Sequence, residues 1–266
     1  CAQKFANNQP ISEFSKVKII ELPLNTKLEN VLGIVEDNDP KKKNNHLKRG
    51  VLSLADRNIL YIDEVNLMQN EIINSILDAA AMGKFTVRQG SFASTFRSRF
   101  TLIGSMNPEE GNLRPQIMDR FGLRVISSGL EKNEERLEAY LRTSQYLNNP
   151  FEYFKSFENE NILARQEIEK ARKFVWKVKI DPQIAKYGID LIKQLRIHSL
   201  RAEITLFEAA KALAASEERE QISLDDIQTI APMALRLRRS QFISNFLSSS
   251  EVENLEIRTA MEKVLG

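Results

Sequence analysis

The stretch NILYIDE, residues 58–64, decides the fold because a short apolar run ends directly in two acids, Asp63 and Glu64. Such a run is typical of a strand buried in a parallel sheet. Ligands bind open α/β sheets outside the carboxyl ends of the strands, so we expect both carboxylates at a binding edge. The alternative is that the two acids only cap a helix beginning near Leu67.

A second apolar run, FTLIG at residues 100–104, precedes Asn107 and Pro108. It predicts another buried strand whose tip lies next to the first, so that Asn107 sits beside Glu64. An amide there can hold a water or touch a γ-phosphate. The alternative is a plain Asn-Pro turn.

The chain between these two strands predicts one helix and one hairpin. Apolar residues recur at close to helical spacing over residues 67–82. Residues 85–99 place Gly90 and Ser91 between β-favouring stretches, which indicates a β-hairpin.

A third element, GNLRPQIMDRFG at residues 111–122, carries Arg114 and Arg120. The planar, always ionised guanidinium suits the charge that develops on a transferring phosphoryl group. The alternative for a lone arginine is a surface salt bridge, which contributes under about 1 kcal/mol.

The strand pattern and the later helical pattern predict two parts. Residues 17–22 indicate a further strand, so the first half reads as a mostly parallel sheet flanked by helices. From about Glu131 onward the pattern is helical, with an N-cap expected at Asp181 before Pro182 and a capping box over residues 223–226. We therefore predict an α/β core followed by a smaller all-α domain.

Two polar stretches, residues 36–48 and 148–161, interrupt the hydrophobic periodicity and predict loops or boundaries. The short lysine run at residues 41–43 is expected to be a solvated loop. Trp176 and the scattered phenylalanines are expected in the core.

Composition excludes several function classes. Among 266 residues, 38 Lys and Arg face 36 Asp and Glu, so a net charge of +2 gives no global reason to bind nucleic acid or an acidic membrane. One cysteine and two histidines exclude an internal disulfide and Cys/His zinc modules. No apolar run approaches the roughly 18 residues of a membrane span. The basic run LRLRR at residues 235–239 is too short to indicate nucleic acid.

Three motifs together resemble a known family. YIDEVNLM at residues 61–68, GSMNPEEGNLRPQIMDRFGL at residues 104–123 and SLRAEITLFEAAKALA at residues 199–214 are similar to the AAA+ ATPase (I) subunit of magnesium chelatase. The resemblance runs from about Ile20 to Arg239 and covers most of the chain.

The resemblance implies a role for each matching position. Asp63 and Glu64 match the Walker B acids, with Asp63 holding the Mg²⁺ of MgATP and Glu64 activating water. Asn107 matches sensor 1. Arg120 matches the arginine finger that acts on the nucleotide of a neighbouring subunit, and Arg201 matches sensor 2, which contacts the γ-phosphate.

The resemblance also implies domains and partners. We expect an AAA+ core at residues 1–128, linker helices at 129–165 and a helical lid with sensor 2 at 166–266. Residues 85–99 match the pre-sensor-1 hairpin. The implied cofactors are ATP and Mg²⁺. The implied partners are further copies in a ring, a D-type AAA+ subunit and a porphyrin-binding H-type subunit. The implied compartment is the cytoplasm, or the plastid stroma in a photosynthetic eukaryote.

The largest departure from the family is that no G-x-x-x-x-G-K-[ST] motif occurs. We expect this P-loop, with its strand and helix, to lie before Cys1, and the 266 residues alone to bind ATP poorly. A smaller departure is that Ser199 and Ala202 flank Leu200 and Arg201, where the family usually has glycines.

Three functions stay open at this point. The first is the ATPase motor that drives Mg²⁺ insertion into protoporphyrin IX during chlorophyll or bacteriochlorophyll synthesis. The second is a related ATPase that serves cobalt chelation or MoxR-like protein remodelling. The third is a nucleotide-dead scaffold, which the intact motifs disfavour.

Overall fold

The computed structural model describes residues 16–36, 46–89, 92–111 and 113–239, together with Ile257 and Met261. The chain divides into two compact units, Cys1–Arg114 and Pro115–Gly266, and each is described here by itself. The expected turn at Gly90 and Ser91 and the lysine run at residues 41–43 lie outside the described residues.

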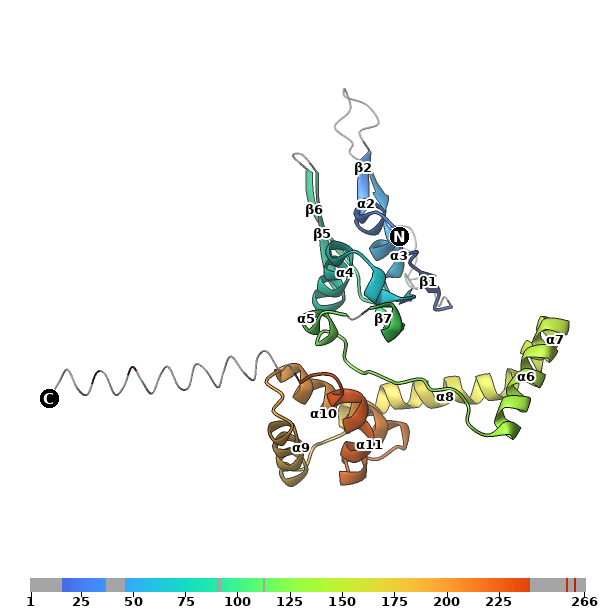
Figure 1. Ribbon diagram of the computed structural model, residues 1–266, viewed down its shortest axis with the longest axis vertical. Helices are drawn as coiled ribbons and strands as arrows, with labels where there is room; N and C mark the ends of the chain where they lie inside the picture. The colour runs from blue at the N-terminus through green and yellow to red at the C-terminus, as the bar shows by residue number, and fades with distance from the viewer. Residues whose placement is uncertain are drawn as a thin grey trace, which may run out of the picture. The chain divides into compact units, whose positions relative to one another are not determined.

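A parallel sheet forms the centre of the first unit (Figure 1). Its strands are β1 (Ile19–Glu21), β4 (Ile59–Ile62) and β7 (Thr101–Gly104), in the order β1-β4-β7. The middle strand β4 buries Leu60 and Ile62 completely, as its alternating pattern requires. Ile62 pairs with Gly104 in parallel register, so the carboxyl ends of β4 and β7 lie side by side. The predicted sheet is confirmed.

Strand β7 is less buried than its apolar sequence indicates. We expected residues 100–104 to be a buried strand, but Ile103 is 46% exposed and Thr101 is exposed too. The physical reason is position, because β7 lies at an edge of the described sheet. An apolar run predicts a strand well, but it does not say whether both faces of that strand are covered.

Helices and two antiparallel hairpins complete the first unit. Helix α4 (Asn70–Met82) buries Ile72, Ile73 and Ile76 on one face, which confirms the helix predicted over residues 67–82. The hairpin expected at residues 85–99 is confirmed by the antiparallel pairing of β5 (Lys84–Gln89) with β6 (Phe92–Arg97). The remaining elements are α2 (Leu28–Leu32), β2 (Gly33–Glu36), β3 (His46–Arg49), α3 (Val51–Ala55), η1 (Val65–Leu67) and η2 (Pro108–Glu110).

The polar stretch 36–48 is not simply a loop. Its two ends belong to β2 and β3, which pair antiparallel from Gly33 with Arg49 to Glu36 with His46. The prediction of a loop was therefore wrong at both ends, while residues 37–45 lie outside the described residues. Backbone pairing forms this hairpin without the alternating apolar residues by which a sequence shows a strand.

The second unit is helical in its described residues. Its core lies where α10 packs against both α9 and α11, with Leu206, Ala210 and Ala214 completely buried (Figure 1). Its elements are α5 (Pro115–Met118), α6 (Asn133–Asn148), α7 (Pro150–Ser156), α8 (Glu158–Phe174), η3 (Val175–Lys177), α9 (Pro182–Gln194), α10 (Leu200–Ser216) and α11 (Leu224–Leu235).

Both helix starts predicted from capping residues are confirmed. Asp181 accepts a hydrogen bond from the Gln183 amide at 2.7 Å and precedes a first-turn proline. Ser223 and Asp226 form the reciprocal capping box of α11. These local signals position the helices around α10.

Two expectations for the second unit were wrong. Residues 148–161, expected to be a loop or boundary, are mostly helical in α7 and α8, because Asn149 caps α7 and Pro150 occupies its first turn. Trp176, expected in the core, is 89% exposed in the short η3 turn. Phe151 and Phe154 are exposed as well.

We predict that Asp226→Asn lowers the free energy of unfolding at pH 7 by about 1–3 kcal/mol, the usual cost of an unpaired buried polar group. Hydrogen bonds from Arg219 hold the pKa of Asp226 below its ordinary value. The stabilisation is therefore complete above the unfolded pKa of about 3.9. It is lost as the pH falls through the lower native pKa.

Urea unfolding at a series of pH values checks this prediction. The gap between parent and variant should narrow below about pH 4, and a gap that is constant across pH would contradict it. Asp225→Asn is the matched control, because Asp225 is the exposed neighbour in the same first turn and should change stability by no more than about 0.5 kcal/mol.

Candidate functional site

The tips of β4 and β7 are joined by Ser105. Its amide donates to the carbonyl of Ile62 at 3.0 Å, and its carbonyl accepts from the Val65 amide at 2.9 Å. Its hydroxyl accepts from the Glu64 amide at 3.0 Å and donates to Asp63 Oδ1. One residue of β7's extension thus fixes both acids at the carboxyl edge of the sheet.

The backbone of Glu64 is strained. It lies in the left-handed region, with φ 51° and ψ 52°, at the point where β4 ends and η1 begins. A residue with a Cβ pays roughly 1–2 kcal/mol for this conformation. Such an outlier persists where its surroundings fix it, here through Ser105, and it is a pointer to function.

The two adjacent acids have opposite electrostatic surroundings. Hydrogen bonds from Ser105 and then from Tyr61, whose hydroxyl lies 3.0 Å from Asp63 Oδ1, hold the pKa of Asp63 below its ordinary value. Repulsion from the Glu110 carboxylate raises the pKa of Glu64. Asp63 is therefore the more firmly ionised member of the pair, and Glu64 is the more ready proton acceptor.

A cavity of about 430 Å³ opens at this edge of the sheet. It lies at the carboxyl ends of β1 and β4, where open α/β sheets bind ligands. Its polar lining is acidic, and the residues that line it are Glu21, Leu22, Pro23, Leu24, Tyr61, Asp63 and Glu64.

Asn107 follows β7 at the same carboxyl edge of the sheet. Its side-chain oxygen accepts from the Glu109 amide at 3.2 Å and caps η2, as expected for an Asn-Pro turn. Its carbonyl accepts from the Asn66 side chain, which also donates to the Gly111 carbonyl at 3.2 Å. The structure thus ties the segment after β7 to the segment after β4.

Two of the arginines predicted for the site, Arg120 and Arg201, belong to the second unit. Arg201 Nη1 donates to Asp119 Oδ2 at 2.9 Å, and the Arg201 side chain is 57% exposed. Arg120, next to Asp119, is partly exposed, and its amide donates to the Ile117 carbonyl at 3.0 Å. Asp119 also accepts from the Ser199 hydroxyl at 2.8 Å. Burial alone would raise the pKa of Asp119, but these hydrogen bonds lower it overall.

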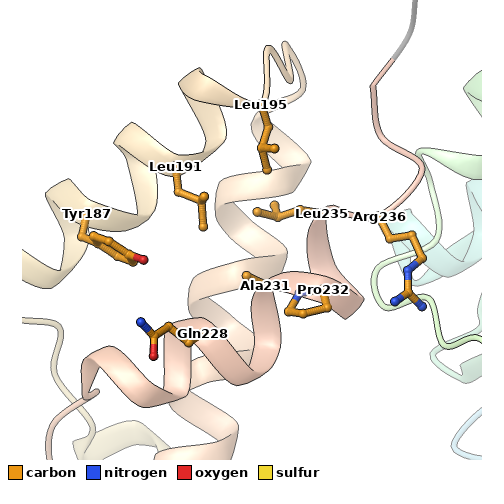
Figure 2. Close-up of a pocket in the computed structure, with 8 residues that line it drawn as sticks. All are labelled: Tyr187, Leu191, Leu195, Gln228, Ala231, Pro232, Leu235 and Arg236. Atoms are coloured by element: carbon orange, nitrogen blue, oxygen red, sulfur yellow. The ribbon is translucent and has the colours of Figure 1, made fainter.

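The helical unit holds a second hollow, a groove of about 490 Å³ between α9 and α11. Figure 2 shows the side chains of Leu191, Leu195 and Leu235 pointing toward one another across it, while the guanidinium of Arg236 points away. The groove is mostly apolar and contains none of the predicted site residues, whereas the cavity beside β4 is lined by Asp63 and Glu64, so that cavity is the candidate site.

Sequence reasoning missed several residues around the site. Ser105 stands two positions before Asn107 in a quoted motif, and a hydroxyl at a strand tip was a readable signal. Glu110 and Asp119 also lie inside quoted motifs. Arg238 lies in the basic run at residues 235–239, and no local signal in the sequence marks it as buried.

Comparison with known proteins places the chain in a family. A Methanocaldococcus jannaschii protein named "Magnesium-chelatase subunit ChlI homolog" is 38% identical over 96% of this chain and 71% of its own length. The chain belongs to the magnesium-chelatase subunit ChlI family. The ChlI subunit of Anabaena variabilis is 32% identical over 96% of this chain and 73% of its own length. The chloroplastic ChlI of Glycine max is 35% identical over 84% of this chain and 53% of its own.

Family models and a solved structure show the fold of the chain. A model described as the MCM P-loop domain matches residues 25–124, and one described as the AAA lid domain matches residues 187–256. A crystal structure of a Cytophaga hutchinsonii protein assigned as an ATPase has a TM-score of 0.58 at 22% identity, covering 90% of this chain and 76% of that one. This ChlI-family chain thus has the AAA+ fold, an α/β part with a helical part.

The described residues contain neither a membrane-spanning helix nor a ready-made metal site. No described helix is long and apolar enough to cross a membrane. Within the same residues, no group of three or more His, Cys, Asp or Glu side chains is placed to hold a metal ion alone.

We predict that Ser105→Ala raises the pKa of Asp63 toward its ordinary value, because the strongest hydrogen bond to the carboxylate is lost. An NMR titration of the Asp63 carboxyl carbon in metal-free protein measures this shift. Ser75→Ala is the control, since the Ser75 hydroxyl donates to the Glu71 carbonyl within α4. If the pKa of Asp63 is the same in Ser105→Ala as in the parent, the Ser105 hydroxyl does not lower that pKa.

Proposed function

We propose that this chain is the ATPase motor subunit of a magnesium chelatase, which couples ATP hydrolysis to Mg²⁺ insertion into protoporphyrin IX. The observation that carries the proposal is the pair Asp63 and Glu64 at the carboxyl edge of β4, fixed by Ser105 in a chain of the ChlI family. An acidic sheet edge with a cavity beside it is where a nucleotide-bound cation is held in α/β sheets.

The residues at this edge fit the Mg²⁺ of MgATP. Mg²⁺ in nucleotide sites takes one or two carboxylates and keeps phosphate and water oxygens as its other ligands. Asp63, exposed and with a lowered pKa, supplies such a carboxylate. The ion, when bound, would neutralise charge on the phosphates. The 266 residues contain no G-x-x-x-x-G-K-[ST] loop, so the phosphate cradle is not among the residues described here.

Glu64 is the proposed base. Its carboxylate orients water and takes its proton, and the neighbouring Glu110 favours this by raising its pKa. The left-handed backbone at Glu64 distinguishes this residue from the strand that ends just before it. Two adjacent acids thereby perform two different tasks at one strand tip.

Three further residues complete the proposed site. Asn107 would act as sensor 1, Arg120 as a finger on the nucleotide of a neighbouring copy, and Arg201 as sensor 2. Support for the last two is that both belong to the helical unit and are linked through the segment at Asp119. Arg201 donates one hydrogen bond to Asp119 and remains largely exposed, so most of its N–H groups can face a phosphate.

The proposed partners follow from the family. A ring of identical copies is needed if Arg120 acts on a neighbour. A D-type AAA+ subunit and a porphyrin-binding H-type subunit would complete the chelatase, with Mg²⁺ and the porphyrin as its substrates. We propose the cytoplasm as the compartment, or the plastid stroma in a photosynthetic eukaryote.

We predict that Glu64→Gln in the full-length protein lowers ATP turnover by about 10²–10⁴-fold, the usual contribution of a general base. Because the amide is nearly isosteric and Asp63 is untouched, the Kd for MgATP should change little. Steady-state ATPase assays and nucleotide titrations give both quantities. Glu71→Gln, on the exposed first turn of α4, is the control expected to keep the parent rate. Parent-like turnover in Glu64→Gln would remove Glu64 from the mechanism.

Metal insertion distinguishes magnesium chelation from the alternatives. The full-length protein is mixed with D-type and H-type subunits, protoporphyrin IX, ATP and either Mg²⁺ or Co²⁺, and metalloporphyrin is followed by fluorescence. The proposal requires Mg²⁺ insertion that Glu64→Gln abolishes. Insertion of Co²⁺ alone would assign the cobalt reaction. ATP turnover with no insertion of either metal would favour protein remodelling.

We also predict a pH effect of Glu110. Because the Glu110 charge raises the pKa of Glu64, Glu110→Gln should lower that pKa and move the acid limb of the ATPase pH profile to lower pH. Glu109→Gln is the matched control, since repulsion from Glu109 is not among the causes of the raised pKa of Glu64. An acid limb that stays in place in Glu110→Gln would show that another group sets it.

A further inference from the structure

The guanidinium of Arg238 is a buried charge that the proposed mechanism does not use. Its side chain is 0% exposed. Nε donates to the Ala234 carbonyl at 2.7 Å near the end of α11, and Nη2 donates to the Thr205 hydroxyl at 3.2 Å on α10. Burying a guanidinium is costly unless its N–H groups are hydrogen-bonded, and these two bonds anchor Arg238 between two helices of the core.

The remaining N–H groups of Arg238 hold the backbone of residues 119–122. Nη1 donates to the Asp119 carbonyl at 2.9 Å and to Asp119 Oδ1 at 2.7 Å. Nη2 donates to the Phe121 carbonyl at 3.1 Å and to the Gly122 carbonyl at 3.0 Å. These acceptors lie on both sides of Arg120 in the chain, so one fork fixes the backbone that carries it.

A second buried arginine holds the same segment. Arg124 Nη2 donates to the Met118 carbonyl at 2.5 Å and to the Phe121 carbonyl at 3.2 Å. Its amide donates to the Met233 carbonyl at 2.9 Å, and its Nη1 donates to the Arg236 carbonyl. Burial, and then the nearby charge of Arg238, lower the pKa of Arg124 to about 10. Residues 118–122 are thus clamped to α11 by two cations.

The turn that delivers Arg238 is strained. Leu237 lies in the left-handed region with φ 57°, although it has a side chain and is exposed. This conformation is unfavourable for a residue with a Cβ and is kept where its surroundings determine it. Its two neighbours in the chain do so, because the Arg236 carbonyl accepts from Arg124 and the Arg238 side chain is buried under residues 119–122.

A stabilising role alone does not explain this arrangement. Burying two like charges together is costly, and apolar side chains of similar volume often stabilise a core as well or better. What two guanidinium forks provide, and apolar packing does not, is a set of directed contacts to particular backbone oxygens. Such contacts fix the position of the backbone that carries those oxygens.

We propose that Arg238 is a positioning residue that fixes the backbone of residues 119–122 and so presents Arg120 to the nucleotide of a neighbouring subunit. This inference rests on the proposed function, in which Arg120 is the finger. Arg124 is the second half of the same clamp. Arg238 does not touch nucleotide itself and acts only through the segment that it holds.

The test compares Arg238→Lys with Arg219→Lys in the full-length protein. Lysine keeps the charge beside Asp119 but removes the fork that grips the carbonyls. Arg219 is the matched control, because it forms a two-pronged pair with Asp226 in the same unit, at 2.8 and 2.5 Å, and holds no part of residues 119–122. Urea unfolding reports the stability cost of each variant.

We expect Arg238→Lys to lower the kcat of ATP hydrolysis by about 10²-fold with an unchanged KM, since a displacement of about 1 Å costs this much. Arg219→Lys should keep the parent kcat. Arg238→Lys is then mixed with an excess of Glu64→Gln subunits, which hydrolyse their own ATP only slowly but present an intact finger, and the turnover of Glu64→Gln alone is subtracted. Turnover should recover, because the Arg238→Lys subunit has a sound site of its own. Arg120→Ala should recover in the same mixture.

The outcomes separate this inference from the proposed function. If the parent protein has no ATPase activity, the proposed function fails. If Arg120→Ala keeps the parent rate, Arg120 is not the finger, and the positioning role of Arg238 is overturned with it. If Arg120→Ala behaves as expected while Arg238→Lys keeps the parent kcat, or loses activity that Glu64→Gln subunits do not restore, the positioning role is overturned. Should Arg238→Lys fail to fold, Arg124→Lys carries the same measurements and the same criteria.

Discussion

The parallel pairing of β4 with β7 is the constraint on which the candidate site depends. Because Ile62 and Gly104 are paired, the next residue along β7, Ser105, meets the end of β4. There its hydroxyl and backbone hold Asp63 and Glu64 together. Neither strand alone would orient these acids, since β4 supplies the carboxylates and the extension of β7 supplies the groups that direct them. A shift in register by one residue would place a side chain of the opposite face at the tip.

In the helical unit, one carboxylate, that of Asp119, joins three segments of the chain. Asp119 accepts from Arg238 on one carboxylate oxygen and from Ser199 and Arg201 on the other. A single carboxylate therefore connects the end of α11, the start of α10 and the segment that carries Arg120. Rigid packing around α10 gives these contacts a fixed frame. The proposed sensor and the proposed finger are consequently parts of one compact body rather than two independent loops.

The sequence predicted the features that depend on neighbouring residues. The strands of the sheet, the helix after β4, the β5–β6 hairpin and the caps at Asp181 and Ser223 all have local signatures, and all are present. The β2–β3 hairpin was not predicted because apolar and polar residues do not alternate along its strands. The exposure of Trp176 was not predicted because burial depends on the tertiary surroundings. The contacts of Arg238 with residues 119–122 could not be predicted from the sequence at all. Arg238 meets Asp119 across 119 positions, and most of its acceptors are backbone carbonyls, which every residue possesses.

The left-handed backbone at Glu64 has a consequence for how this family can change over time. Glycine or asparagine tolerates that conformation better than glutamate does, so a substitution there would relieve strain and make the fold more robust. Selection for stability alone would therefore not retain glutamate at this position. In a descendant that had lost the catalytic role proposed for Glu64, glycine or asparagine at this strand tip would be expected to raise the melting temperature.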